Sequence, residues 1–162
     1  MKKSVISLLV LVCYLLSGCS FFGERIREPV TLYYLCKNYQ EDLCCVIAEE
    51  EREASGHVGD LPYLLALYLM GPAEDEHRSP LPAGTQIAAS SENGHLLILL
   101  SNTGSVSETD FSLICACLTL TCLEITDAES VTVQIGEKEK TMTRSSLTLL
   151  DTTQETTQPE ES

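Results

Sequence analysis

Apolar residues beyond residue 29 first fall into two short runs, and these runs predict two strands. Val30–Cys36 is rich in β-branched and aromatic residues, which favour a strand. Leu43–Ala48 is a second apolar run, separated from the first by a polar turn, and is its simplest hairpin partner. The acidic run Glu49–Glu53 that follows favours a helix by intrinsic propensity alone.

A first helix is predicted to begin after Asp60 and to end before Gly71. The Asp60 carboxylate can accept hydrogen bonds from the free amides of the first turn. Pro62 lies in that turn, where its missing N–H costs nothing. The sequence Gly71-Pro72 then ends the helix, because glycine can adopt the left-handed conformation and proline cannot continue the helix. The segment is apolar almost all round, so we expect it to be buried between layers.

A charged loop over residues 73–79 leads into a predicted strand pair. Gln86–Ser91 forms the first strand, and Asn93-Gly94 is a strong signal for a tight hairpin turn of type I′. His95–Ser101 returns as a run that is apolar on both faces, so we expect it to be a central strand.

A second helix and a last strand complete the pattern. The spacing of Ser107 and Asp110 fits a capping box. Apolar residues then recur on one helical stripe, with Ser112, Thr119 and Glu124 facing away. Val131–Ile135 alternates apolar and polar residues, as in a half-buried strand, and Thr141–Leu150 can add a short edge strand. The predicted order is ββαββαβ, an α+β fold in which two helices pack on one face of an antiparallel or mixed sheet.

The string Ser79-Pro-Leu-Pro-Ala-Gly-Thr85, placed after an apolar helix that ends in Gly71-Pro72, resembles the GerM-type sporulation and spore germination domain. The resemblance covers residues 30–150, which we take as one domain. It implies the same order of helices and strands. It also favours a strand at Leu43–Ala48 followed by a polar stretch, against the helical propensity of Glu49–Glu53, and we follow the resemblance.

The N-terminal residues resemble the signal peptide of a bacterial lipoprotein. Met1–Lys3 is basic, and Ile6–Leu16 is apolar but too short to span a bilayer. The sequence Leu16-Ser-Gly-Cys19 resembles a lipobox, which implies a signal peptide over residues 1–18 and attachment of diacylglycerol to the Cys19 sulfur. Residues 19–29 would then tether the domain to the membrane. The alternative is an ordinary secretory signal with an incidental cysteine.

The charge of the chain excludes one class of partner. It carries 24 acidic and 10 basic residues, a net charge of −14, and cleavage before Cys19 would make it more acidic still. An acidic surface repels nucleic acid, so we expect no nucleic-acid partner. Thr152–Ser162 contains no apolar residue to bury, and we expect residues 151–162 to form a disordered acidic tail.

Few residues could carry catalytic or metal chemistry. His57, His77 and His95 lie in predicted loops or turns without a nucleophile motif, which favours solvated histidines over an active site. Glycine-rich nucleotide motifs and metal-ligand spacings are absent from the sequence. We therefore expect no enzymatic activity, no metal and no cofactor.

The cysteines of the exported domain are Cys36, Cys44, Cys45, Cys115, Cys117 and Cys122. An exported chain permits disulfides, whereas small buried thiols are the simpler interpretation, and the sequence leaves the choice open. Cys115 and Cys122 share a helical face about 10 Å apart along the axis, which is too far for a bridge between them.

The resemblance implies a lipid-anchored, non-enzymatic protein on the outer face of the bacterial cytoplasmic membrane. Its role would be assembly or scaffolding with another envelope protein in sporulation or germination. The candidate docking surfaces are the loop residues Glu74, Asp75, Glu76 and Arg78, and a sheet edge near Val131–Ile135. The alternative is an extracytoplasmic ligand-binding lipoprotein for a cell-wall fragment or a small solute, which would need a roomy apolar pocket. A hydrolase is the third and last candidate.

Overall fold

The computed structural model describes residues 28–38 and 46–147. Its elements are β1 (Pro29–Cys36), β2 (Ile47–Glu53), α2 (Leu61–Leu69), β3 (His77–Arg78), β4 (Gln86–Glu92), β5 (His95–Ser101), α3 (Glu108–Ile125), β6 (Ser130–Ile135), β7 (Lys138–Thr143) and the 3-10 turn η2 (Arg144–Ser146). This order contains the predicted ββαββαβ sequence, with β3 added, and confirms the α+β class. The short edge strand expected over Thr141–Leu150 is β7, which begins earlier, at Lys138, and ends at Thr143. The signal peptide, Cys19, residues 43–45 and the acidic tail lie outside the described residues.

The strands form two sheets, whereas the sequence analysis expected one. One sheet has the order β2-β1-β3, and the other has the order β4-β5-β6-β7 with β5 and β6 parallel. Side chains of α2 and α3 hydrogen-bond to the edge of β1, where another strand could otherwise join the first sheet. Tyr33 N–H donates to Thr121 Oγ1 at 3.0 Å, and Tyr68 Oη donates to the Tyr33 carbonyl at 3.0 Å. Because these backbone groups are satisfied by α2 and α3, the two sheets remain separate.

The acidic run folds as strand β2 rather than as a helix or a polar connector. It pairs antiparallel with β1 from Pro29↔Glu53 to Leu35↔Ile47. The side chains alternate, so Glu50 is buried while Glu49 and Glu51 are exposed. The expected strand boundary at residue 48 is therefore wrong, because pairing with β1 outweighs the local helical propensity of the run.

Helix α2 begins and ends where its sequence predicts. The Asp60 side chain accepts from Tyr63 N–H at 3.2 Å, and Gly71 after the helix has a φ of +82°. Leu65 is buried as expected, and Tyr68 stacks on Tyr34 of β1 with ring centroids 5.0 Å apart. The expectation of burial all round is wrong on one side, however, because Tyr63 is 38% exposed and Leu69 is 39% exposed.

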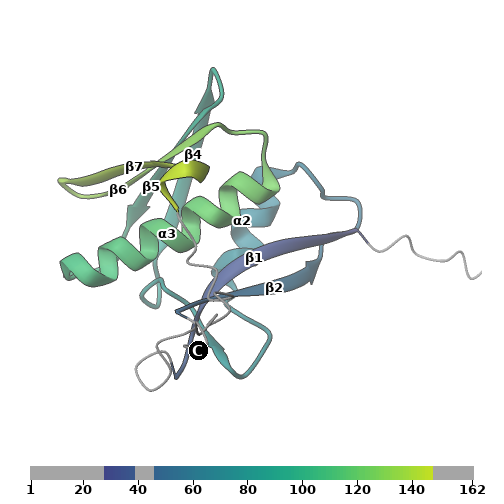
Figure 1. Ribbon diagram of the computed structural model, residues 1–162, viewed down its shortest axis with the longest axis horizontal. Helices are drawn as coiled ribbons and strands as arrows, with labels where there is room; N and C mark the ends of the chain where they lie inside the picture. The colour runs from purple at the N-terminus through teal and green to yellow at the C-terminus, as the bar shows by residue number, and fades with distance from the viewer. Residues whose placement is uncertain (1–27, 39–45, 148–162) are drawn as a thin grey trace, which may run out of the picture.

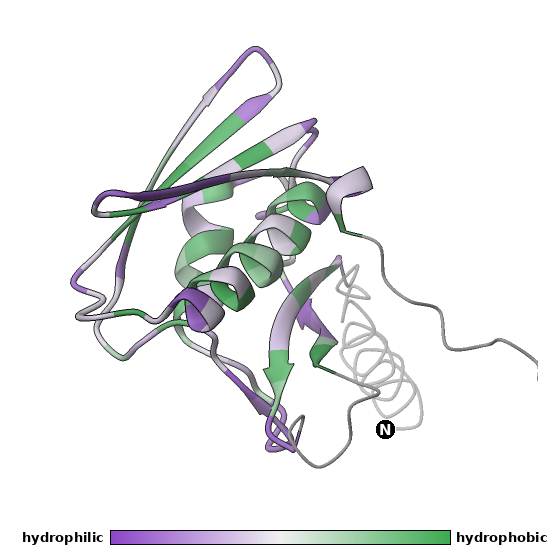
Figure 2. Ribbon diagram, turned by 60° about the vertical axis from the view of Figure 1, so that its left-hand side comes forward, coloured by the Kyte–Doolittle hydropathy of each residue, from purple (hydrophilic) through white to green (hydrophobic). Residues whose placement is uncertain are grey.

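Helix α3 lies between the two sheets (Figure 1). Ser107 caps it by accepting from Asp110 N–H at 3.1 Å. Ser112 and Glu124 are exposed as predicted, whereas Thr119 is fully buried, and every residue from 117 to 123 is buried. The helix is therefore not amphipathic in its middle, because the β2-β1-β3 sheet covers the side that was expected to meet water. Figure 2 shows much of the helical ribbon in green, the colour of hydrophobic residues.

The β4–β5 hairpin turns at Asn93-Gly94, whose positive φ values of 51° and 76° confirm the predicted turn. Strand β5 is central, as its apolar pattern predicts. The expected edge at Val131–Ile135 is wrong, because these residues belong to β6, which lies between β5 and β7. The segment from Lys138 supplies the edge strand instead, since a two-residue turn after Ile135 returns the chain along β6.

Candidate functional site

The best-defined polar site is built around Glu50 on β2. Its register partner on β1 is Leu32, and its side chain points from the same face of the sheet, so only 2% of it is exposed. A carboxylate taken out of water costs several kcal/mol unless hydrogen bonds and opposite charge replace the lost hydration. The site must therefore supply several donors.

Four donors surround the Glu50 carboxylate. Oε1 accepts from Ala73 N–H at 2.8 Å and from Arg52 Nη1 at 3.2 Å. Oε2 accepts from Glu74 N–H at 3.3 Å and lies 3.1 Å from His77 Nδ1. An ionised carboxylate can only accept, so His77 Nδ1 carries the hydrogen in this pair. The Glu50 side chain thus joins β2 to the segment that follows α2.

The same contacts determine the charge of Glu50. Burial by itself raises the pKa of its carboxyl, but the hydrogen bonds from the Ala73 amide, His77 and the Glu74 amide, together with the Arg52 charge, outweigh burial. The pKa of Glu50 therefore lies below its ordinary value of 4.5. The carboxylate is ionised at neutral pH and binds the loop through charge-assisted hydrogen bonds.

The loop over residues 73–79 is held at further points besides Glu50. Arg52 Nη1 also donates to the Gly71 carbonyl at 2.9 Å, just before the loop. Lys37 N–H donates to the Glu76 carbonyl at 2.9 Å, and β3 pairs with the end of β1. The loop is consequently attached at its start, its middle and its end, and its backbone has little freedom to rearrange.

The structure divides the four predicted docking residues into two groups. Glu74, Asp75 and Glu76 are exposed at the tip of the loop. Arg78 is half-buried in β3, and its charge lowers the pKa of the Cys117 thiol of α3, against the larger effect of burial, which raises that pKa to about 12. The exposed part of the predicted surface is therefore the three carboxylates.

His77 corrects one expectation and Glu50 reveals one omission. His77 was expected to be a solvated loop histidine, but its side chain is 10% exposed because it packs against Glu50. Glu50 itself was not singled out from the sequence, because the acidic run appeared uniform. The sequence held no signal that separates Glu50 from its neighbours, because the period-two burial pattern appears only once β2 pairs with β1.

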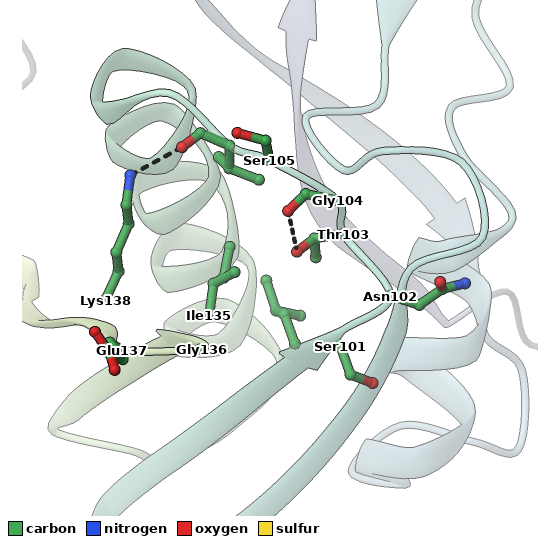
Figure 3. Close-up of a pocket in the computed structure, with 11 residues that line it drawn as sticks. Ser101, Asn102, Thr103, Gly104, Ser105, Ile135, Gly136, Glu137 and Lys138 are labelled. Atoms are coloured by element: carbon green, nitrogen blue, oxygen red, sulfur yellow. Dashed lines mark hydrogen bonds between the residues drawn. The ribbon is translucent and has the colours of Figure 1, made fainter.

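The ligand-binding alternative has a cavity of suitable size at the ends of two strands. A hollow of about 700 Å³ lies beyond the carboxyl ends of the parallel strands β5 and β6, lined by residues 100–106 and 135–138 (Figure 3). Ligands often bind at such strand ends. Here the Lys138 ammonium is engaged by the protein itself, because Nζ donates to the Val106 carbonyl at 2.8 Å and lies 2.6 Å from Glu108 Oε1. The hollow therefore presents no free cation to a ligand.

The cysteines of α3 behave as core residues. Burial raises the pKa of Cys115 to about 11 and that of Cys122 to about 12. Such thiols stay protonated at neutral pH and are poor nucleophiles. No disulfide joins Cys36 and the three cysteines of α3 to one another. Cys44 and Cys45 lie outside the described residues.

The described residues contain neither a metal-binding cluster nor a helix that could span a membrane. Across residues 28–38 and 46–147, no cluster of three or more His, Cys, Asp or Glu side chains has an arrangement that could hold a metal ion. Within the same ranges, neither helix has the length and apolar character needed to cross a membrane. The two remaining histidines contact neighbouring side chains. His57 stacks on Tyr63, and His95 Nδ1 lies 2.8 Å from Ser130 Oγ.

The sequence matches no protein-family model and no curated protein. Among solved structures, the chain is similar to the first GerMN domain of the sporulation protein GerM from Bacillus subtilis. The sequence identity is 18%, the match covers 70% of this chain and 86% of that chain, and the TM-score is 0.47. The tandem GerMN domains of the same protein match 70% of this chain and 40% of that chain, with 18% identity and a TM-score of 0.47.

Proposed function

We propose that this protein is a lipid-anchored, non-enzymatic assembly factor of the bacterial envelope that acts in sporulation or germination by docking onto another envelope protein. The observation that carries the proposal is the exposed group Glu74, Asp75 and Glu76 on a loop that the buried Glu50 holds in place. A loop that is already ordered loses little conformational entropy when it binds, so its contacts convert efficiently into affinity. Three adjacent carboxylates favour a partner with a basic surface.

The cellular setting of the proposal comes from the sequence. The string Leu16-Ser-Gly-Cys19 supports a lipid anchor on the outer face of the cytoplasmic membrane. The string Ser79–Thr85, through its resemblance to the GerM-type domain, supports a role in sporulation or germination. The engagement of Lys138 within the hollow at the ends of β5 and β6 makes the ligand-binding alternative the weaker candidate.

The docking role predicts a selective loss of partner binding when the loop loses its charge. Replacing Glu74, Asp75 and Glu76 together with serine should reduce recovery of the partner from native membranes by about tenfold, which corresponds to about 1.4 kcal/mol. The fold should be unaffected within about 0.5 kcal/mol, because these side chains are exposed. The measurement is a quantitative pull-down with the full lipidated chain, together with a urea melt of each variant.

The matched control removes the same charge elsewhere. Asp127, Glu137 and Glu139 are exposed and lie outside the loop, so replacing them with serine should leave recovery unchanged. Equal recovery by the loop variant and the control would contradict loop docking. If the parent recovers no protein but binds a cell-wall fragment, the ligand-binding alternative replaces the assembly role.

The anchor is tested separately at Cys19. A cysteine sulfur is required for diacylglycerol attachment, so Cys19→Ala should abolish incorporation of labelled palmitate and leave an uncleaved precursor or a protein released from the membrane fraction. Fractionation with radiolabelled palmitate measures both effects, and Ser20→Ala beside it serves as the control. Labelling that persists in Cys19→Ala would rule out this anchor.

A further inference from the structure

Strand β4 is an edge strand whose free edge carries no charge until its last residue. Three edge strands of the two sheets have six or more residues: β2, β4 and β7. Strand β2 contains four glutamates and an arginine, and β7 begins Lys-Glu-Lys, which Figure 2 shows largely in purple. The sequence of β4 is QIAASSE, without proline, and only Glu92 is charged. Proteins usually protect exposed edges with charge or proline, and β4 lacks both over residues 86–91.

The hairpin geometry shows which backbone groups this edge offers. In a two-residue hairpin the residues that flank the turn, Glu92 and His95, exchange hydrogen bonds, and pairs further along alternate. The backbone groups of Ile87, Ala89 and Ser91 therefore point away from β5. Within the described residues these groups form no other hydrogen bond, and every residue of β4 except Ile87 is exposed. The free edge can thus donate and accept along its length.

An apolar groove lies beside this edge. Its volume is about 230 Å³, and it is lined by Leu61, Pro62, Leu65, Ala66 and Leu69 of α2 and by Ile87 and Ala89 of β4. Leu69, which lines the groove, is 39% exposed, and the next residue in the chain, Met70, is 78% exposed. Apolar surface beside an unpaired edge is unusual on a chain with a net charge of −14.

A strand that paired with the β4 edge would also place side chains over the groove. Ile87 and Ala89 are opposite the buried residues Leu100 and Ile98 of β5, so their side chains lie on the inner face of the sheet. A strand paired to β4 would lie about 4.8 Å further out and would continue that face. Its alternate side chains would then lie over α2, so backbone hydrogen bonds and a side-chain groove act together, as in β-augmentation.

We propose that the β4 edge binds an extended segment of a partner protein. The segment has large apolar residues on its inward side and carries no acidic residue. The inference rests on the proposed docking function and adds a second surface to it. In the two-fold antiparallel pairing centred on Ala89, strand β4 of another copy is a poor occupant, because its residues opposite Ile87 and Ala89 would be Ser91 and Ala89, which are too small to fill the groove. Two copies would also repel each other through their negative charge.

The test uses a synthetic peptide of about nine residues that alternates Leu or Val with Thr or Lys. Its affinity for the full lipidated chain in detergent is measured by fluorescence anisotropy. A peptide of the same composition with a central proline should bind much more weakly. We expect binding to slow hydrogen exchange of the Ile87, Ala89 and Ser91 amides.

Two variants separate the edge from the groove. Ala89→Pro removes one outward N–H and leaves the ladder with β5 intact, and Ala66→Glu places a charge in the groove. Each should weaken peptide binding by about tenfold or more. The matched control is Glu139→Pro, which removes an outward N–H from the charged edge β7 and should leave binding unchanged. Thermal melts of all three variants test whether they fold. Ala66→Glu tests the groove without requiring that a strand tolerate a proline.

The outcomes distinguish this inference from the docking function on which it rests. Equal peptide affinity in the parent, Ala89→Pro and Ala66→Glu would overturn the inference. A dimer in sedimentation that Ala89→Pro abolishes would also overturn it, in favour of a second copy. The serine variant of Glu74, Asp75 and Glu76 should bind the peptide as the parent does. If that variant retains its partner in the pull-down while peptide binding still requires the β4 edge, docking through the loop is contradicted and the proposal for the β4 edge stands.

Discussion

Replacing Glu50 with alanine is expected to lower the free energy of unfolding by about 3–5 kcal/mol, the cost of removing one partner from a buried ion pair. The substitution leaves the guanidinium of Arg52 without its carboxylate and leaves the amides of Ala73 and Glu74 without an acceptor. Urea denaturation followed by circular dichroism measures the loss. Glu51→Ala on the exposed face of the same strand is the control and should change stability by no more than about 0.5 kcal/mol.

The pH dependence of the parent and of Glu50→Gln distinguishes a charge effect from lost packing. Because the pKa of Glu50 in the folded state lies below 4.5, its ionised form stabilises the fold. This stabilisation is present above pH 4.5 and is lost as the pH falls through the lower folded-state pKa. The parent should therefore lose stability more steeply than Glu50→Gln below pH 4.5. Identical pH profiles would mean that the carboxylate charge contributes nothing.

Replacing Leu118 with alanine is expected to cost about 2–5 kcal/mol, because the leucine is fully buried in the middle of α3 between the two sheets. Neither sheet can close the resulting cavity without disturbing its contacts with the helix. For a domain of this size the midpoint of thermal unfolding should fall by about 10 °C or more. Leu69→Ala is the control, since Leu69 is already 39% exposed and should matter less. A loss below about 1 kcal/mol for Leu118→Ala would indicate that α3 is not enclosed on both sides.

The Glu50 result also bears on function. If the buried carboxylate orders the loop, Glu50→Ala should weaken partner binding even though Glu74, Asp75 and Glu76 remain. The serine variant of these three residues would weaken binding without destabilising the fold. Glu50→Ala therefore tests whether binding requires an ordered loop, and the serine variant tests whether binding requires the three carboxylates.

The sequence by itself determined the features that depend on neighbouring residues. Asp60 and Ser107 cap their helices, because a side-chain oxygen needs only amides two or three residues away. Asn93-Gly94 forms its turn, since these residues tolerate a positive φ wherever they occur. The same local signals placed the charged loop between Gly71-Pro72 and Pro80, so its exposed carboxylates could be predicted. Their role in binding stays a prediction.

Only the tertiary structure decided which surfaces the elements cover. Glu49–Glu53 becomes a strand because β1 offers it a ladder, and a period-two burial pattern appears only once that partner is in place. Thr119 is buried because a second sheet covers α3, and Thr121 helps to close that sheet by accepting from Tyr33. The hydrophobic pattern shows which side of an element is apolar, but not what packs on its polar side. Glu50 belongs to this second group, because three of its four donors, Ala73, Glu74 and His77, lie more than twenty positions away in the chain.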